Sequence, residues 1–370
     1  MELLKRVADK TIGEKYELPD LVFDFFGDMD GKGAYVKEHY IRMADQYKTI
    51  DMRYDAFDWQ NGVGWFGLLE ANKKLRDERY WDFIRAWTDA HLERGLPPQS
   101  INSTAPMFAV LQLCRHTGDH RYRAVCEYAA QYCMAQAARA DQGTLEHSVN
   151  SDRSKLASQI WADTAFMAGI FLAEWGRFTG NDMYCMEALR QIRLHYHYLT
   201  DPKTGLMYHA YNCQLRHHMS GVRWGRANGW GVVSSVEILQ RVPDYAEGRA
   251  QVMENLQRHA DALKQYQDAS GSWHTVLDHP ETYLETTVAC AVYYGVKKAL
   301  AAGYIHGDYR DMLSRAEQYI KAHAAPDGEA LGTSAGTPVM ASVEEYGRIP
   351  CAMSYYGQGL MLMALSQMEE

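Results

Sequence analysis

The sequence predicts an all-α fold in which helical hairpins close into a ring. Three observations lead to this prediction. Apolar residues recur at helical spacing, strand-like alternation is sparse, and a short helix–turn–helix segment recurs along the chain. No low-complexity linker interrupts the 370 residues, so residues 1–370 are expected to form one domain.

The helical spacing is clearest in two stretches. The first carries Tyr80, Phe83, Ile84 and Trp87, and the second covers residues 124–133 with its alanine, cysteine and tyrosine side chains. Apolar residues three and four positions apart lie on one face of a helix, so each stretch predicts a helix with one buried side.

The repeated segment marks the turns between helices. Leu113–Tyr122 and Trp175–Tyr184 each end one helix in Thr-Gly, turn on Asp or Asn, and begin a helix whose first turn holds a tyrosine. Leu75–Tyr80 is a degenerate copy, and His306–Tyr309 is a shorter candidate. Because the copies are irregularly spaced, a closed ring is favoured over an open solenoid. In such a ring, the long loops would lie at one end and build a pocket.

Composition argues against two classes of binding partner, nucleic acids and membranes. The net charge is −9, so binding to the polyanionic backbone of nucleic acid is not expected. No apolar run approaches the roughly 20 residues that cross a membrane. Residues 1–18 are charged throughout and resemble an amphipathic helix rather than a signal peptide.

The seven cysteines are scattered singly, which fits a reducing compartment better than a disulfide framework. We therefore expect a cytoplasmic protein, although a periplasmic protein trimmed of its signal would look the same. No cluster of zinc ligands is visible, and neither a metal nor an organic cofactor is expected. The sequence does not predict an oligomeric state.

The loops between the predicted hairpins concentrate polar and aromatic residues. Trp, His, Asp and Arg from several loops are the usual lining of a carbohydrate pocket, because sugar faces stack on aromatic rings and hydroxyls need polar partners. The segments concerned are 58–62, 99–106, 146–147, 159–164, 208–211, 223–230 and 273–274.

Asp163 is the sharpest single candidate for catalysis. It heads DTAFMAGIFLAEW, which is apolar for two turns, and such surroundings are expected to raise the pKa of a carboxyl group towards a general-acid range. Asp is also a preferred helix N-cap, and Thr164 follows it. The residues alone leave both roles open.

Arg226, in RWGRANGW, could bind a substrate carboxylate with its forked guanidinium, or it could be a surface arginine beside two core tryptophans. His147 and His209 could contact substrate hydroxyls or adjust a neighbouring carboxylate, and either could equally be structural. The tryptophans of these loops could stack on a sugar or belong to the core; they are Trp59, Trp161, Trp224 and Trp230.

Taken together, these segments resemble glycoside hydrolase family 105, the unsaturated rhamnogalacturonyl hydrolases, and more distantly the family 88 unsaturated glucuronyl hydrolases. QIWADTAFMAGIFLA at 159–173 and WGRANGW at 224–230 carry the resemblance, which extends from about residue 55 to the C-terminus. Flanking matches are TGLMYHAY at 204–211, GSWHTVLDHPETYLETT at 271–287 and Gly-Thr-Ser at 332–334.

The resemblance implies an (α/α)6 barrel, a six-hairpin toroid with the pocket at its loop end. It also implies that Asp163 is the general acid/base, and that the uronate site includes Arg226, Trp224 and Trp230. His147 and His209 would be pocket histidines, and Trp59 matches a region where the family has an aromatic that contacts substrate. Asn102 stands where many members carry a second important Asp, so it could bind substrate but not share a proton.

The chemistry implied by the resemblance is hydration of a C4=C5 double bond in a terminal uronic acid of a short oligosaccharide left by a polysaccharide lyase. The substrate expected on this basis is an unsaturated rhamnogalacturonan disaccharide, with the aglycone undetermined. Two other functions stay open at this stage. One is a sugar 2-epimerase, which shares the barrel and uses pocket histidines. The other is a carbohydrate-binding relative without catalysis, which the presence of Asn102 mildly favours.

Overall fold

The computed structural model describes residues 1–13, 54, 56–149 and 156–369, and within these ranges the all-α prediction is confirmed. The inner helices are α4 (Trp59–Leu75), α7 (Met107–Thr117), α9 (Ile170–Thr179), α11 (Gly225–Leu239), α13 (Thr286–Ala301) and α16 (Tyr355–Ser366). The outer helices are α1 (Glu2–Gly13), α5 (Glu78–Arg94), α8 (His120–Ala135), α10 (Asp182–Leu199), α12 (Arg249–Gln265) and α14 (Arg310–Ala322).

Short elements connect these helices. They are the helical turns α6 (Ile101–Thr104), η1 (Asp141–Gly143), η3 (the π-turn Ala165–Gly169) and α15 (Val343–Tyr346), and the strands β1 (Gln159–Trp161), β2 (Ala210–Asn212), β3 (Trp273–His274) and β4 (Leu284–Glu285). β1 pairs antiparallel with β2, and β3 with β4.

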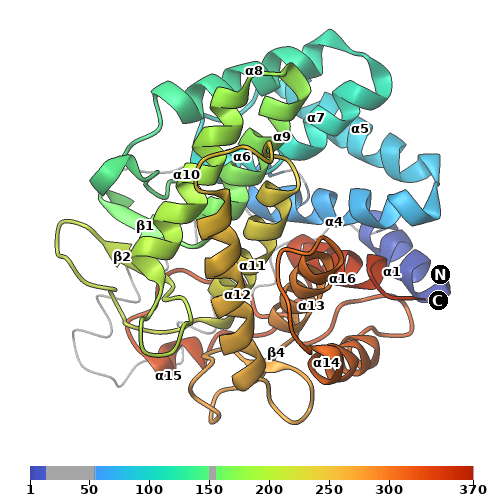
Figure 1. The fold of residues 1–370 in the computed structure, drawn as a ribbon. Coiled ribbons are helices and arrows are strands. Elements are labelled where there is room, and N and C mark those ends of the chain that lie inside the picture. Colours follow the sequence, from blue (N-terminus) through green and yellow to red (C-terminus); the bar gives the residue numbers. More distant parts are fainter. Residues whose placement is uncertain (14–53, 55, 150–155, 370) are drawn as a thin grey trace, which may run out of the picture.

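The six inner helices form a closed ring, as the resemblance implied for an (α/α)6 barrel. Each contacts the next in the order α4, α7, α9, α11, α13 and α16, and α16 packs on α4 to close the circle. Five hairpins join consecutive inner and outer helices. The sixth pair joins the two ends of the chain, because α1 lies against α16 (Figure 1). The N-terminal helix expected over residues 1–18 is confirmed as α1, and residues 14–18 lie outside the described ranges.

Helix caps account for the predicted turns. After α7, Gly118 takes a left-handed conformation at φ 74°, and the Asp119 side chain accepts a hydrogen bond from the backbone N–H of Arg121 to start α8. Gly180 and Asn181 repeat this arrangement between α9 and α10. The repeated segment therefore encodes hairpin turns, as predicted.

The tyrosine of the repeated turn joins neighbouring outer helices. In the copies that end at Tyr80, Tyr122 and Tyr309, the tyrosine hydroxyl donates to an aspartate on the preceding outer helix, as Tyr122 does to Asp89 at 2.9 Å. Tyr80–Asp9 and Tyr309–Asp261 follow the same rule. Asp89 also forms an ion pair with Arg121 at 3.2 Å.

The inner ring is tightest where α4 crosses α16. A Cβ added at Gly359 would lie 2.4 Å from the Val63 carbonyl oxygen, so only glycine permits this backbone contact. No helix in the described ranges is both long and apolar enough to cross a bilayer.

Candidate functional site

The β1–β2 ladder brings the two central residues of the site together. Trp161 pairs with Ala210, and the Ala162 N–H donates to the carbonyl of His209 at 3.1 Å. Asp163 lies two residues beyond the end of β1, and His209 immediately precedes β2. Pairing of the two short strands therefore fixes the backbones of Asp163 and His209 side by side, although 46 positions separate them in the sequence.

The Asp163 carboxylate points at two ring nitrogens. Its Oδ1 accepts a hydrogen bond from Trp230 Nε1 at 3.1 Å, and its Oδ2 lies 3.5 Å from His209 Nε2. Only 9% of the residue is exposed. The alternative role of Asp163 as a helix N-cap is therefore wrong, because its oxygens face side chains of other elements and the next turn is the π-turn η3.

Electrostatics around Asp163 correct a second expectation. Burial on its own raises the pKa of Asp163, but the hydrogen bond and charge of His209, with the charges of His147 and Arg226, outweigh it and leave the pKa below its usual value. Burial lowers the pKa of His147 to about 4 and also lowers the pKa of His209. Both imidazoles are therefore neutral near pH 7, and the lasting stabilisers of the carboxylate are its N–H donors and Arg226.

The two histidines are held by aromatic rings. His147 stacks on Trp161 with ring centroids 4.5 Å apart and planes 8° apart, and its Nδ1 lies 3.1 Å from the Thr164 hydroxyl. The His209 ring packs against Trp224 with centroids 4.0 Å apart, and Trp161 approaches it edge-on at 5.2 Å. We call these side chains, with Asp163 and Trp230, the Asp163 cluster.

Arg226 lies next to the Asp163 cluster and is fully buried. Nη1 donates to the Ser334 hydroxyl at 2.8 Å and to the Ser334 carbonyl, and Nη2 donates to the Ala335 carbonyl at 2.9 Å and to the Thr337 hydroxyl. Glu285 lies 3.6 Å away. The guanidinium group therefore donates to protein oxygens, whereas the sequence suggested that it could bind a substrate carboxylate.

The Arg226 guanidinium also lies over two rings, 4.7 Å from the centroid of Trp224 and 4.9 Å from that of Tyr356. These contacts join α11, α16 and the loop over residues 334–337. The alternative of a surface arginine is also corrected, because none of the side chain is exposed.

Asn228 supports the site and was missed by sequence reasoning. Its Oδ1 accepts from the Met207 N–H at 2.7 Å, and its Nδ2 donates to the Met207 carbonyl at 2.9 Å. His259 Nε2 lies 2.9 Å from the same Oδ1. Because Met207 lies two residues before His209, this amide clamp holds the strand that presents His209. Four alternating residues of WGRANGW therefore contact or support the site: Trp224, Arg226, Asn228 and Trp230. The sequence alone did not indicate the supporting role of Asn228.

Trp59 and Asn102 lie at the edge of the arrangement. Trp59 begins α4, meets Trp230 edge-on at 6.5 Å and packs on Tyr356 at 4.8 Å. Asn102 is buried in α6, which contacts η3, and its Oδ1 has no hydrogen-bond partner in the described ranges. Gln60, in the predicted loop segment 58–62, is buried with both amide atoms unpartnered among the same residues, although it was not named as a candidate.

Tyr346 was also missed by sequence reasoning. It ends α15 and is fully buried, and its hydroxyl lies 2.6 Å from His209 Nδ1. The contact joins positions 137 apart in the sequence. Since VEEYGR carries no recognisable motif, only the folded chain brings Tyr346 to the site.

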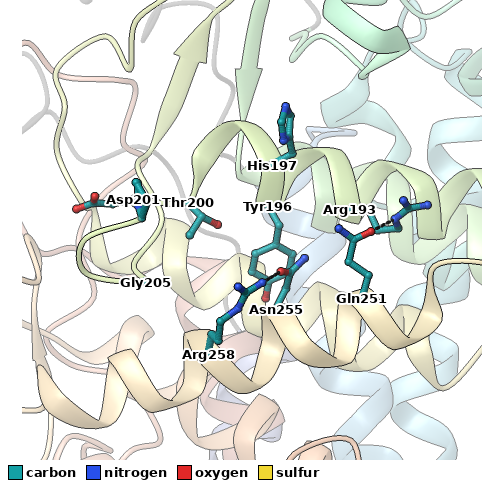
Figure 2. A pocket seen from close by; sticks show the side chains of 10 residues that line it. Arg193, Tyr196, His197, Thr200, Asp201, Gly205, Gln251, Asn255 and Arg258 are labelled. Carbon is teal, nitrogen blue, oxygen red and sulfur yellow. Dashed lines mark hydrogen bonds between the residues drawn. The ribbon is translucent and has the colours of Figure 1, made fainter.

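Two pockets of the described chain lie away from the Asp163 cluster. One, of about 360 Å³, lies between α10 and α12 and is lined by Arg193, Tyr196 and Arg258 among others (Figure 2). The other, of about 300 Å³, is lined by residues from α4, α5, α7 and α9 and by Arg241, which follows α11. None of the predicted site residues lines either. In the part of the chain that the structure describes, no three His, Cys, Asp or Glu side chains are grouped to hold a metal ion.

The fold and the site together define a class of protein. A ring of helical hairpins carries, among loops at one end, a buried carboxylate surrounded by indole and imidazole rings. This combination of one acid/base group with aromatic surfaces is suited to chemistry on a carbohydrate.

Comparison with known proteins identifies the family. Residues 35–370 match the model of Glycosyl Hydrolase Family 88. The chain is 35% identical over 321 residues to the unsaturated rhamnogalacturonyl hydrolase YesR of Bacillus subtilis, a match that covers 86% of this chain and 91% of that one. The chain therefore belongs to glycosyl hydrolase family 88 and is a glycosidase acting on a carbohydrate substrate.

Solved structures agree with the fold. A Klebsiella pneumoniae protein described as a possible member of family GH105 superposes with a TM-score of 0.84 at 26% identity, over 99% of this chain and 91% of that one. The unsaturated glucuronyl hydrolase of Bacillus sp. GL1 superposes with a TM-score of 0.70 at 18% identity, over 98% and 94% of the chains. The resemblance and the (α/α)6 barrel inferred from the motifs are confirmed.

Proposed function

We propose that this glycosidase removes a 4,5-unsaturated uronic acid from the non-reducing end of a short oligosaccharide, and that its substrate is an unsaturated rhamnogalacturonan disaccharide. The choice of aglycone rests on the likeness to the Bacillus subtilis hydrolase, which extends over most of both chains. The reaction type rests on one observation, the Asp163 carboxylate held between Trp230 Nε1 and His209 Nε2.

In this scheme a single carboxylate serves first as acid and then as base. The unsaturated ring is a vinyl ether, in which the ring oxygen pushes electrons through C5 towards C4. Protonated Asp163 donates its proton to C4, and the positive charge left at C5 is shared with the ring oxygen. The Asp163 carboxylate then takes a proton from a water molecule as that water adds to C5.

The resulting hemiketal opens to a C5 ketone, and C1 becomes a hemiacetal that releases the aglycone alcohol. One water molecule is consumed, and Asp163 ends the cycle protonated as it began. Such general acid–base steps contribute roughly 10²- to 10⁴-fold to the rate. Asn102, in place of a second aspartate, would bind a substrate hydroxyl through its unpartnered Oδ1.

Substrate binding is proposed to raise the pKa of Asp163, so that the carboxylate takes up a proton from solvent. The pKa of Asp163 lies below its usual value before substrate binds. A uronate carboxylate brought close to Asp163 adds a like charge and displaces water, and both changes favour the protonated form. We therefore assign the acid form of Asp163 to the complex rather than to the free enzyme.

We also propose which residues contact the substrate directly. Trp59 would supply a ring face and His147 a polar contact, whereas Trp224 and His209 would act by holding the cluster around Asp163 in place. Arg226 would act indirectly, because its donors already hold the loop at Ser334. We also propose a cytoplasmic location, which the seven unpaired cysteines favour.

Turnover in heavy water tests the reaction type. Hydration places one solvent deuteron at C4 of the released uronate, which proton magnetic resonance detects. Displacement at the anomeric carbon would leave the vinyl proton at C4 in place. A product that keeps its vinyl proton would refute the hydration scheme, and release of aglycone only from unsaturated glucuronyl disaccharides would refute the choice of substrate.

A further inference from the structure

We propose that Tyr346 is a positioning residue for this reaction, because its hydroxyl holds His209 in the Nε2–H tautomer and so aims a proton at Asp163. The proposal rests on the function proposed above for Asp163. It assigns a role to a side chain that lies behind the histidine, on the side away from the carboxylate.

The hydrogen bond between Tyr346 and His209 is short and shielded from water. The hydroxyl oxygen lies 2.6 Å from Nδ1, and the two residues are 0% and 1% exposed. A neutral imidazole offers one donor and one acceptor, so this contact determines which ring nitrogen carries the proton. Either the phenol donates to Nδ1, or Nδ1–H donates to the phenol.

The surroundings favour the phenol as donor. Burial raises the pKa of Tyr346, which keeps its proton on the oxygen, and the Asp163 carboxylate, which can only accept, faces the opposite ring nitrogen of His209. With Nδ1 as the acceptor, the ring proton must lie on Nε2. That nitrogen has no other partner in the described ranges and lies 3.5 Å from Asp163 Oδ2.

Neighbouring rings prevent His209 from turning away. Trp224 covers its face at 4.0 Å, and Trp161 meets it edge-on at 5.2 Å. The distance of 3.5 Å to Asp163 is longer than a usual N–H···O bond, and catalytic hydrogen bonds commonly tighten only in the substrate complex. A fixed ring and a fixed tautomer leave the imidazole ready for that shortening.

With Tyr346 bonded to Nδ1 of His209, each oxygen of the Asp163 carboxylate faces one N–H donor. Trp230 Nε1 donates to Oδ1, and His209 Nε2–H faces Oδ2. Asp163 is thereby oriented for proton transfer to and from the substrate. In the other tautomer, an Nε2 lone pair would face the carboxylate and repel it. The remaining titratable groups that act on these three residues are His147, His195, Arg226 and Glu345.

Tyr346→Phe tests the role by removing only the hydroxyl. We expect kcat to fall about tenfold, the size of one lost buried hydrogen bond, with KM changed less than about twofold. Tyr293→Phe is the matched control, since it removes a buried tyrosine hydroxyl that donates to Glu317 at 3.0 Å on the outer side of the ring. That variant should keep wild-type kcat, and an unchanged kcat in Tyr346→Phe would overturn the proposal.

The tautomer gives a readout that a merely structural role would not move. In protein labelled with nitrogen-15 histidine, long-range proton–nitrogen correlation spectra distinguish Nδ1–H from Nε2–H, and a His209→Gln spectrum identifies the His209 signals. We expect Nε2–H in the wild type and a mixture in Tyr346→Phe. A wild-type Nδ1–H tautomer would overturn the proposal even if the variant failed to fold. Because this spectrum needs no substrate, it tests the tautomer even if the proposed function is wrong.

Discussion

Removing the indole N–H of Trp230 should raise the pKa of Asp163. In Trp230→Phe the donor to Oδ1 at 3.1 Å is lost while an aromatic ring remains. A hydrogen bond to a buried charged group contributes about 1.5–3 kcal/mol, and about 1.4 kcal/mol corresponds to one pKa unit. Because the bond stabilises the carboxylate form, its loss should raise the pKa by about 1–2 units.

The pH dependence of kcat reports this shift, since kcat reflects ionisation in the substrate complex. If protonated Asp163 starts the reaction, kcat falls as pH rises through its pKa. The alkaline limb should therefore move to higher pH by about 1–2 units in Trp230→Phe. Trp87→Phe is the control, because it loses a comparable indole bond, to the Tyr54 carbonyl at 2.7 Å, on an outer helix. An alkaline limb that stays in place, or moves to lower pH, in a folded Trp230→Phe would refute this account of Asp163.

Two further predictions concern stability. Gly359→Ala should lower the free energy of unfolding by at least about 1–3 kcal/mol, because the new Cβ would meet the Val63 backbone at 2.4 Å. Gly13→Ala is the control, because a Cβ at Gly13 would have no neighbour within 4 Å. It should change the free energy of unfolding by less than about 0.5 kcal/mol, and equal urea midpoints for the two variants would contradict the packing argument. Burial lowers the pKa of His259 to about 3, so its contribution is present above the unfolded pKa of about 6.5 and is lost as pH falls below it. Between pH 7 and 5, His259→Gln should therefore lose about 2 kcal/mol less than the wild type in urea unfolding, and parallel losses would exclude the linkage.

Local signals in the sequence were sufficient to predict the hairpins. The stop at Gly118 and the start at Asp119 act within one turn of chain, so the helix boundaries could be read from them. Ring closure was predicted only indirectly, from the irregular spacing of the repeated segment and from the family resemblance. The pairing of α1 with α16 joins the two ends of the chain, and no short pattern encodes it.

The same distinction separates what was predicted of the site from what was missed. Asp163 and Trp230 lie in long motifs, and the fold places them in contact. Tyr346 is invisible without the fold, because its partner lies 137 positions away. The residue type of Arg226 suggested a substrate carboxylate, but a residue type does not reveal that protein carbonyls already occupy the fork.

The pKa of Asp163 shows the same limit. Apolar neighbours in the sequence predicted a raised pKa, and burial does act in that direction. The contrary influence of His209 comes from the β1–β2 pairing, and that of Arg226 comes from another helix. The sign of the shift thus depends on which polar groups the fold brings to the carboxylate, and spacing along the chain does not give it.

The most direct test of the central claim follows the ultraviolet absorbance of the conjugated alkene in an unsaturated rhamnogalacturonan disaccharide. Wild-type protein should abolish the absorbance as aglycone is released in equal amount, and folded Asp163→Asn should leave it essentially unchanged. Aglycone release with the absorbance intact, or substantial turnover by Asp163→Asn, would contradict the assignment of hydration chemistry to Asp163.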